Sequence, residues 1–409
     1  MIPPASDPPA ASAAKVLALV RILCQPLAPV RIQLDDATGR VLRESVAAPE
    51  DQPAFDRSAV DGFAVQLDDP SVRFLIVDEI RAGDWKPRDL QQGEAVRIAT
   101  GGAIPGTGLE VVMLEETRID GPILTIPRRT GDRNIRFKGE DARAGQTLVE
   151  SGIILEPGAL ALLAGAGCSH PLVSRLPEVL HLATGNEIVP PGQQPERGHI
   201  RDTNSTLVRA FLGRRGIVPI QVRTGEDREA IATTLRAALA ESPPDILLIS
   251  GGASVGQHDF TRQLLVELGF TIHVSRTTSR PGKPLIVARK GQVIAFGLPG
   301  NPLAHFVCLN LFLRAALNAF AGLPAPARGD FQTARLTVDL PADGSPRETF
   351  WPARWSLADG TVALMPLRWA SSGDLTSLAS ANALIRVPAR TTFLEQGSQV
   401  QFIPANDTP

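Results

Sequence analysis

The sequence contains no tyrosine and only three cysteines among its 409 residues. Cys24, Cys168 and Cys308 are far apart and odd in number, which argues against a disulfide framework. Cysteines that stay reduced are typical of the cytoplasm, and we expect these three to pack in cores. The composition therefore favours a cytoplasmic protein stabilised by burial of apolar side chains.

Long hydrophobic runs and clusters of positive charge are also lacking. No run of about 18 apolar residues occurs, and the Pro/Ala-rich stretch from Met1 to Pro9 lacks the basic and apolar parts of a signal peptide. The formal net charge is -2, without a basic face interleaved with aromatic residues. We therefore expect neither a membrane nor a nucleic acid as partner.

Lysine is scarce, because most of the 41 cationic side chains are arginines. A chain that uses arginine by default can keep a lysine where a compact, strongly hydrated ammonium group is needed. Lys283, in a Pro-Gly-Lys-Pro turn, is the candidate for such a role. Compositional bias with a few surviving lysines explains Lys15 and Lys290 equally well.

The length predicts two to four units with separate cores. Short Val/Ile/Leu runs alternate with Gly/Pro turns in a β-rich unit at 48–140, which is flanked by 1–47 and 141–176. Strand and helix patterns then alternate over 177–325, which predicts a doubly wound α/β domain. Strand-like alternation returns at 326–409, where we expect a small β-barrel or sandwich.

Local patterns add more detailed expectations. Apolar positions from Val16 to Leu27 recur at helical spacing, and Val30, Ile32 and Leu34 alternate as in a strand. Thr203 or Asn204 is expected to cap one helix. Asn301-Pro302 is expected to begin a long helix, with an Asn cap and Pro at the first helical position.

Four unusual loops follow strand-like runs of the α/β domain: Thr184–Glu187, Ser250–Gly256, Arg280–Pro284 and Gly297–Pro302. Open parallel sheets bind ligands beyond the carboxyl ends of their strands, so these loops are predicted to converge. The second loop has three glycines in seven residues, whose backbone amides can approach a phosphate closely. A tight turn without a ligand explains that loop equally well, but four such loops together favour a binding site.

Carboxylates accompany the loops. Glu187 follows the first strand, Asp227 stands at a helix start, and Asp259 comes just after the glycine-rich loop. Oxygen ligands suit Mg²⁺, which takes one or two carboxylates and completes its shell with water and substrate phosphate. Helix capping explains Asp227 or Asp259 equally well when each is taken alone. Asp259 is the better candidate because it adjoins the glycine-rich loop.

The N-terminal half holds two compact groups of charges and turns. Asp56, Ser58 and Asp61 fall within six residues, and Asn134–Asp141 contains Arg136, Lys138, Glu140 and Asp141. Either group could be a solvated loop. Spacing alone does not bring them to the α/β domain.

Five segments, in this order, resemble the molybdopterin molybdenumtransferase family, called MoeA in bacteria and similar to the E-domain of gephyrin. They are Phe55–Phe63, Arg97–Pro105 with Val111–Glu115, Asn134–Asp141, Ser250–Gly256 with Asp259, and Arg280–Pro284 with Gly297–Pro302. Five ordered motifs across nearly the whole chain are far more specific than one glycine signature. Some positions depart from the family pattern, among them Arg57, Phe63, Asn186, Gln257-His258 and Arg280.

The resemblance implies a multi-domain α/β plus β fold and a homodimer. The linker and dimerisation domain would be 1–47 with 141–176, the inserted β-rich domain 48–140, the MogA-like molybdopterin-binding domain 177–325, and the β-barrel 326–409. The active cleft would lie near the dimer interface, with the Asp61 and Asp141 segments facing an α/β domain of the partner subunit.

The resemblance also implies roles for individual residues. The catalytic residues would be Asp61, Asp141, Asp259 and Lys283, and the metal ligands Asp227 and Asp259. The substrate would be bound by Thr100, Glu187, Ser250, Gly251, Gly252, Ser254, Arg280, Pro299, Gly300, Asn301 and Ser372.

The implied activity is insertion of molybdate into adenylyl-molybdopterin with release of AMP, with Mg²⁺ as cofactor. Molybdate is a dianion, so bringing it to a phosphate requires cations and amide donors, which Arg280, Lys283 and the start of the helix after Asn301 could supply. Transient partners would be the molybdopterin adenylyltransferase and apo-molybdoenzymes. A molybdopterin adenylyltransferase and a non-catalytic pterin-binding scaffold are the alternatives. The additional terminal domains argue against the first, and the retained carboxylates against the second.

Overall fold

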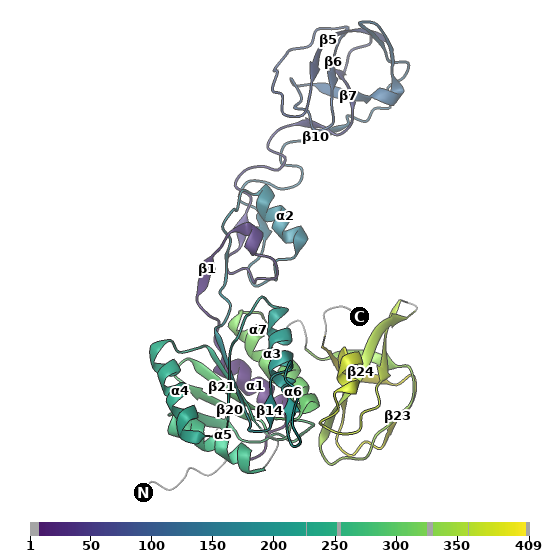
Figure 1. Ribbon diagram of the computed structural model, residues 1–409. Helices are drawn as coiled ribbons and strands as arrows, with labels where there is room; N and C mark the ends of the chain where they lie inside the picture. Colours follow the sequence, from purple (N-terminus) through teal and green to yellow (C-terminus); the bar gives the residue numbers. More distant parts are fainter. Residues whose placement is uncertain (1–7, 226, 252–254, 325–329, 359, 406–409) are drawn as a thin grey trace. The chain divides into compact units, whose positions relative to one another are not determined.

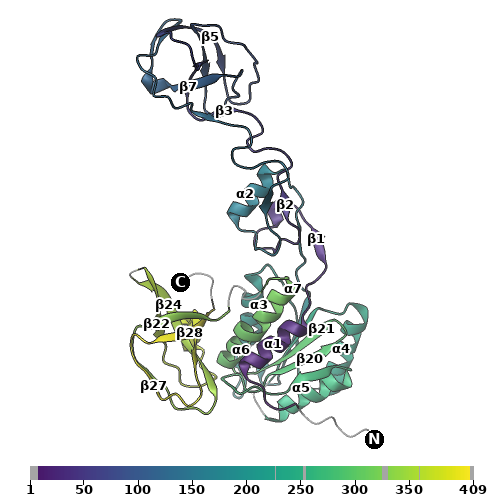
Figure 2. The ribbon, with the colours of Figure 1, turned by 180° about the vertical axis from the view of Figure 1, so that it is seen from behind.

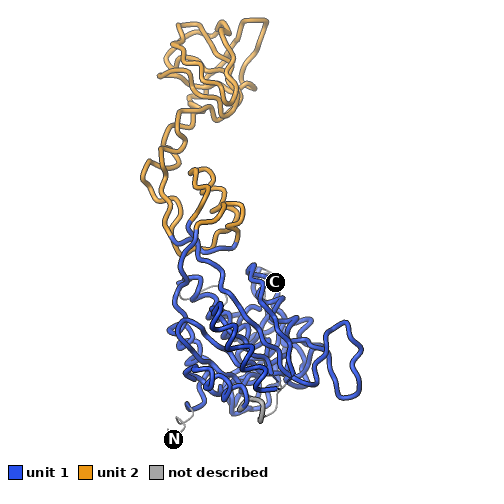
Figure 3. The backbone as a smooth tube through the Cα atoms, turned by 60° about the vertical axis from the view of Figure 1, so that its left-hand side comes forward, with its two compact units in different colours: residues 1–30, 39–43, 172–409 blue, residues 31–38, 44–171 orange. Residues whose placement is uncertain are grey.

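The computed structural model describes residues 8–225, 227–251, 255–324, 330–358 and 360–405, with the side chains of 255–259 and 358 left out (Figure 1). The chain divides into two compact units (Figure 3). Unit 1 comprises Met1–Val30, Gly39–Arg43 and Leu172–Pro409, and unit 2 comprises Arg31–Thr38 and Glu44–Pro171. Along the chain, unit 2 is therefore an insertion into unit 1.

Unit 2 contains a six-stranded sheet in the order β7-β4-β6-β5-β9-β8. Its strands are β4 (Gly62–Gln66), β5 (Arg73–Ile80), β6 (Glu94–Ile98), β7 (Leu109–Met113), β8 (Arg118–Asp120) and β9 (Ile123–Thr125). Successive side chains of a strand point to opposite faces, so Val96 and Ile98 join one apolar cluster while Ala95 joins another with Phe63 and Phe74. The alternation in the sequence therefore builds apolar clusters on both faces of this sheet.

Shorter elements complete unit 2. β3 (Arg57–Ser58) pairs with β10 (Ile135–Arg136), and β2 (Val46–Ala47) with β11 (Thr147–Val149), both antiparallel. The remaining helical elements are η1 (Leu34–Asp36), η2 (Leu114–Glu116) and α2 (Pro157–Gly165). The β3–β10 pair brings the two charged segments noted in the sequence side by side.

Unit 1 is built on a six-stranded sheet in the order β16-β13-β17-β21-β20-β18. Its strands are β13 (Val179–Thr184), β16 (Ile220–Thr224), β17 (Ile246–Ser250), β18 (Thr271–Val274), β20 (Ile286–Lys290) and β21 (Val293–Leu298). The first four strands in the order are parallel, whereas β20 is antiparallel to both β21 and β18.

Helices cover both faces of this sheet. Figure 1 shows α4 (Arg228–Glu241) and α5 (Val255–Glu267) on one face, and Figure 2 shows α1 (Ala13–Leu23), α3 (Asn204–Gly213) and α6 (Pro302–Cys308) on the other. Ile246 and Leu248 of β17 pack in the cluster on the α3 side, whereas Leu247 and Ile249 pack in the cluster on the α4 side. The continuous apolar run of this strand is thus explained by burial on both faces.

One helix of unit 1 is unusually long and apolar. α6, η3 (Leu309–Leu313, of π-helical geometry) and α7 (Arg314–Phe320) form one helix from Pro302 to Phe320. Its mean hydropathy of 1.5 and length would allow it to cross a membrane, but 89% of it is buried inside unit 1. The helix is not an uninterrupted apolar run, because it contains Asn310, Arg314 and Asn318, and one mostly buried helix of this kind is weak evidence for a membrane span. Burial against the sheet accounts for the composition.

The C-terminal part of unit 1 is a closed barrel. β24 (Glu348–Ala358), β25 (Thr361–Pro366), β22 (Gln332–Leu336), β28 (Gln399–Pro404) and β26 (Ala383–Val387) pair in that order, and β26 pairs back with β24. β19 (Ser279–Arg280) pairs in parallel with β24 and so joins the barrel to the α/β part. The other short elements are β23 (Leu340–Pro341), β27 (Phe393–Leu394), α8 (Thr376–Ser380), β14 (Ile188–Val189) and β15 (Ile200–Arg201).

The predicted fold class, with β-rich, doubly wound α/β and C-terminal barrel parts, is confirmed, but two local expectations are not. The helix expected over Val16–Leu27 is displaced, because α1 runs from Ala13 to Leu23. The strand expected through Val30 and Leu34 ends early, because β1 covers Pro29–Arg31 and pairs with β12 (Leu172–Ser174), while Leu34 begins η1. Three alternating apolar residues are too short a signal to separate a strand from a turn.

Candidate functional site

Three parallel strands of unit 1 end side by side. Ala183 pairs with Ser250 and Ser250 with Leu298, so the carboxyl ends of β13, β17 and β21 lie at one edge of the sheet. β20 runs antiparallel to β21 and therefore begins at this edge, which places the preceding loop, 280–284, there as well. All four loops singled out in the sequence thus leave from the edge where open sheets bind ligands.

The first two loops touch each other. Thr184 Oγ1 donates to the carbonyl oxygen of Ser250 at 3.3 Å, and a Cβ atom added at Gly251 would lie 2.8 Å from Thr184 Oγ1. Gly185 has a φ of 151°, and a Cβ there would lie 2.6 Å from a carboxylate oxygen of Glu187. Glycine is required at these positions because backbone and side chains approach so closely. The Glu187 carboxylate folds back over the end of β13.

The loop after β21 is held from the α3 side of the sheet. Asn204 Nδ2 donates to Gly300 O at 2.7 Å, and His305 Nδ1 donates to Pro299 O at 3.0 Å. In a trans peptide the N–H points opposite to the carbonyl, so the N–H groups of Gly300 and Asn301 point away from Asn204 and His305. Two backbone donors are thereby held in a fixed direction at the predicted site.

Asn301 is the N-cap residue of α6 and Pro302 begins the helix, as expected, but the Asn301 side chain makes no capping hydrogen bond. Asn301 Nδ2 instead donates to Ser372 Oγ at 2.7 Å, and Leu303 N donates to Ser372 O at 3.0 Å. The carbonyl of Ser372, from the barrel, thus satisfies an N–H in the first turn of α6. The structure therefore brings together Asn301 and Ser372, which are 71 residues apart.

Thr203, one of the two residues expected to cap α3, is its N-cap residue. Neither Thr203 nor Asn204 caps it with its side chain, and Asp202 Oδ1 accepts from Ser205 N at 3.0 Å instead. Asp202 Oδ2 binds Arg223 of β16 at 3.0 Å. Asn204 is thereby left to hold Gly300, a long-range contact that the local capping pattern does not reveal.

The two predicted cations of the unit 1 site have different surroundings. Arg280 forms an ion pair with Asp343, and its guanidinium lies 5.5 Å from the centroid of the Trp369 ring. The hydrogen bond from Arg280 lowers the pKa of the Asp343 carboxyl. Lys283 is exposed, while its carbonyl oxygen accepts from Thr277 N at 2.9 Å. Arg280 is thus partly neutralised, and Lys283 is open to solvent.

The predicted metal ligands are described only in part. Asp227 is the N-cap of α4, where Oδ1 accepts from Glu229 N at 3.0 Å and Ala230 N at 3.2 Å. The side chain of Asp259, like Gly252 and Ser254 as a whole, lies outside the described residues. Within the described part of the chain, no group of three His, Cys, Asp or Glu residues could hold a metal ion.

In unit 2, Asp61 and Thr100 lie together. Asp61 Oδ1 accepts from Thr100 N at 2.7 Å and from Thr100 Oγ1 at 3.1 Å. The backbone hydrogen bond from Thr100, followed by that from its hydroxyl, lowers the pKa of the exposed Asp61 carboxyl. The adjacent Gly62 permits close approach of β4 and β7, because a Cβ there would lie 2.1 Å from Val112 O. Asp61 is thus ionised and oriented at neutral pH.

Asp141 lies in the segment that pairs with the Asp61 segment. Arg136, whose backbone is paired with Arg57, forms ion pairs with Asp141 and, at 3.2 Å, with Glu140. Lys138 N donates to Asp56 Oδ1 at 2.7 Å, which ties the two segments together a second time. The two charged motifs of unit 2 are therefore held side by side.

Two buried histidines were not singled out in the sequence. His181 and His305 both have a relative exposure of 0%. Burial lowers the pKa of His181 to about 3 and that of His305 to about 4, so both are neutral at pH 7. A polar residue inside the apolar run of β13 is the signal that could have revealed His181.

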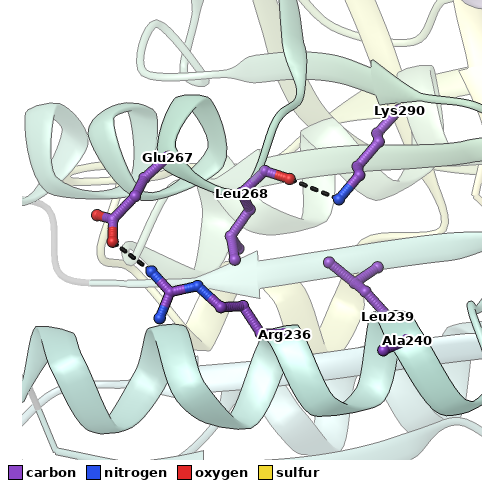
Figure 4. A pocket seen from close by; sticks show the side chains of 6 residues that line it. All are labelled: Arg236, Leu239, Ala240, Glu267, Leu268 and Lys290. Atoms are coloured by element: carbon purple, nitrogen blue, oxygen red, sulfur yellow. Dashed lines mark hydrogen bonds and ion pairs between the residues drawn. The ribbon is translucent and has the colours of Figure 1, made fainter.

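A small pocket lies at the other edge of the sheet. It measures about 260 Å³ and is bounded by the ends of α4, α5 and β20 (Figure 4). Arg236 Nη2 binds Glu267 Oε1 at 2.5 Å, and Lys290 Nζ donates to Leu268 O at 2.7 Å. The pocket thus lies at the opposite end of the strands from the loops of the candidate site. Its two cations, Arg236 and Lys290, already bind groups of the protein.

The fold and the site define a multi-domain α/β protein with a candidate ligand site at the strand ends of its central sheet. Residues 9–167 match the family described as MoeA N-terminal region (domain I and II), 181–319 the probable molybdopterin binding domain, and 333–405 the MoeA C-terminal region (domain IV). The chain belongs to the molybdopterin molybdenumtransferase family, whose members are transferases of molybdenum cofactor biosynthesis.

Relatives and solved structures agree with this assignment. A molybdopterin molybdenumtransferase of Nostoc sp. is 35% identical over 384 residues, covering 90% of this chain and 87% of the relative. One from Bacillus subtilis is 34% identical over 386 residues, covering 91% and 89%. A molybdopterin biosynthesis MoeA protein from Pyrococcus horikoshii has a crystal structure with a TM-score of 0.79 at 28% identity, covering 97% of this chain and 99% of that one.

Proposed function

We propose that this chain inserts molybdate into adenylyl-molybdopterin and releases AMP. The observation that carries the proposal is the set of loops at one sheet edge, in a chain that belongs to this transferase family. In the proposed reaction, a molybdate oxygen attacks the phosphorus of the adenylyl group and displaces the pterin phosphate. The two dithiolene sulfurs then bind molybdenum, which releases AMP with that oxygen and a second oxygen as water formed with the thiol protons.

The unit 1 site would bind the two anionic substrates. The oriented N–H groups of Gly300 and Asn301, together with the exposed ammonium group of Lys283, supply the donors and positive charge that bring a dianion to a phosphate. Arg280 would supply a second cation if it released Asp343 and bound the substrate anion instead. Gly251, at the start of the glycine-rich turn, has no side chain that would screen its backbone from a phosphate.

Magnesium is part of the proposal. Mg²⁺ commonly uses one or two protein carboxylates and takes its other ligands from water and phosphate, so a set of three protein ligands is not needed. Asp227 and Asp259 would hold it. Asp227 fits this role because only its Oδ1 is used in capping α4, and because it follows β16 at the ligand-binding edge. Bound there, Mg²⁺ would offset the negative charge of the phosphate oxygens.

The proposal extends to assembly and location. A homodimer is proposed because, by resemblance to the family, the Asp61 and Asp141 segments would face an α/β domain of the partner subunit. A cytoplasmic location is supported by the three free cysteines, Cys24, Cys168 and Cys308. Transient contact with the adenylyltransferase and with apo-molybdoenzymes would provide the substrate and receive the product.

The test is a turnover assay with the purified chain. It would be incubated with adenylyl-molybdopterin, Mg²⁺ and molybdate, and AMP release and metal-bound pterin would be measured. We expect both products to form together and to depend on molybdate. Formation of the adenylate from ATP and molybdopterin would instead favour an adenylyltransferase, and pterin binding without turnover would favour a scaffold.

A further inference from the structure

A line of polar groups crosses the α3 side of the unit 1 sheet and ends at the ligand-binding edge. Gln221 of β16 is paired directly with His181 of β13, and His181 Nε2 lies 2.7 Å from Ser250 Oγ at the end of β17. Gln221 Nε2 lies 3.0 Å from His181 Nδ1. At the other end of the line, Arg209 of α3 binds Gln221 Oε1 from Nε at 3.0 Å and Nη2 at 2.7 Å.

The direction of the hydrogen bonds follows from Arg209. A guanidinium group donates and cannot accept, so the Gln221 atom that it binds must be the amide oxygen. The amide nitrogen then faces Ser205 O at 2.8 Å and His181 Nδ1 at 3.0 Å. Since an amide NH₂ group donates both of these bonds, His181 Nδ1 must be the acceptor.

The hydrogen bond accepted by His181 Nδ1 fixes which ring nitrogen of His181 donates to Ser250. Burial lowers the pKa of His181 to about 3, so its ring is neutral and carries one proton. With Nδ1 accepting, that proton is on Nε2, which donates to Ser250 Oγ. The serine oxygen is therefore an acceptor within the protein, and no other partner of this hydroxyl occurs among the described residues.

We propose that Arg209, Gln221 and His181 form a one-way relay that commits the Ser250 hydroxyl to donate its proton to an anionic oxygen of the ligand. Ser250 directly precedes Gly251 at the start of the glycine-rich turn, so the oxygen would belong to a phosphate group. The three residues of the relay are positioning residues, because they act on the ligand through Ser250. The identity of the ligand as the substrate's phosphate rests on the proposed function, whereas the direction of the relay does not.

The discriminating change is Gln221→Glu, which keeps the shape of the side chain and reverses its hydrogen bonding. A carboxylate beside Arg209 accepts and cannot donate, so His181 must place its proton on Nδ1. Nε2 then accepts from Ser250, whose proton turns away from the ligand. The ¹⁵N shifts of the His181 ring report this tautomer directly. We expect an Nε2–H ring in the wild type and an Nδ1–H ring in the variant, and an Nδ1–H ring in the wild type would overturn the relay.

Binding of AMP, measured by calorimetry, tests the consequence for the ligand. We expect the dissociation constant to rise about 10-fold in Gln221→Glu and by a similar factor in Ser250→Ala, the loss of one hydrogen bond to a charged group. If the carboxylate of Gln221→Glu weakened AMP binding directly, by charge repulsion, its effect on the dissociation constant would add to that of Ser250→Ala in the double variant. The relay predicts no further loss in the double variant, and additive losses would refute it.

Gln401→Glu is the matched control, because Gln401 Oε1 also accepts from an arginine, Arg386, at 2.7 Å, but in the barrel and without a histidine. It should leave AMP binding unchanged, and a 10-fold loss there would count against the relay. Wild-type protein with the Nε2–H ring and serine-dependent AMP binding, but without AMP release from the adenylate, would overturn the proposed function and leave the relay intact.

Discussion

In unit 2 the predicted carboxylates Asp61 and Asp141 are exposed, whereas in unit 1 the two histidines beneath the strand ends are buried and neutral. Asp61 accepts two hydrogen bonds from Thr100, which lower its pKa, and Asp141 is paired with Arg136. His181 and His305 have no exposed surface, and burial lowers the pKa of each. Unit 2 thus offers full negative charge at neutral pH, and unit 1 offers oriented dipoles.

In the proposed reaction, the two units would therefore contribute in two different ways. A carboxylate in water can take up a proton or hold a hydrated ion, and its effect depends on its charge. A buried neutral group acts through a fixed hydrogen-bond direction, which persists over a wide pH range. Substitutions that remove charge should therefore affect unit 2 most, and substitutions that reverse donors and acceptors should affect unit 1 most.

The largest expected effect is that of Asp61→Asn, which removes the charge and keeps an oxygen that can accept from Thr100. If the charge of Asp61 takes part in the reaction, AMP release should fall roughly 100- to 1,000-fold, as for loss of a group that moves a proton. Circular dichroism and urea unfolding should be unchanged. The matched control is Asp120→Asn, which removes an exposed carboxylate from β8. Equal turnover of Asp61→Asn and wild type would remove this residue from the chemistry.

Gly62→Ala tests how much the close packing of β4 and β7 beside Asp61 contributes to the stability of unit 2. A Cβ at this position would lie 2.1 Å from Val112 O, so β4 and β7 must separate. We expect a loss of roughly 3 kcal/mol in the free energy of unfolding, at the upper end of overpacking effects. Urea unfolding measures it. Gly158→Ala is the control, since nothing lies within 4 Å of its added Cβ in α2, and it should not destabilise the protein.

The sheet of unit 1 and the charged motifs of unit 2 could be predicted from the sequence, because both leave patterns within short segments. The strand-helix alternation at 177–325 and the glycine-rich loops predicted a doubly wound sheet with its strand ends together, as the structure has it. The two charged motifs of unit 2 were visible as short segments. Their pairing through β3 and β10 was not, since antiparallel partners about 80 residues apart leave no periodic trace.

The contacts that orient the unit 1 site could not be predicted. Local rules gave Asn204 and Asn301 capping roles, but long-range partners, Gly300 and Ser372, take their side chains instead. Asp343 lies in a turn whose sequence predicts only a loop. It forms an ion pair with Arg280 because β19 pairs with the barrel strand β24. Tertiary contacts override capping preferences wherever a polar side chain finds a better-placed partner.

The pH dependence of stability should come mainly from the buried histidines. Their folded pKa values, about 3 for His181 and about 4 for His305, lie below the usual 6.5, so below pH 6.5 the unfolded state binds protons that the native state does not. Stability should therefore fall as the pH falls, by about 2 kcal/mol per histidine between pH 6.5 and 5. Urea unfolding of His305→Gln at both pH values should show a smaller loss than in wild type. An identical loss would mean that His305 is not neutral in the fold.

Asp343→Asn should have the smallest effect, and it should strengthen molybdate binding, whereas the other substitutions lower activity or stability. Asp343 neutralises Arg280, so a substrate anion must compete with it for the guanidinium. Removing the charge should tighten molybdate binding about three-fold, the scale of one exposed ion pair, whereas Arg280→Gln should weaken it. Equilibrium dialysis measures both. Asp78→Asn, which removes the ion pair with Lys86 in unit 2, should leave molybdate binding unchanged. Weaker binding in Asp343→Asn would instead mean that Asp343 holds Arg280 in its binding position, and that unit 1 also uses a carboxylate to orient its site.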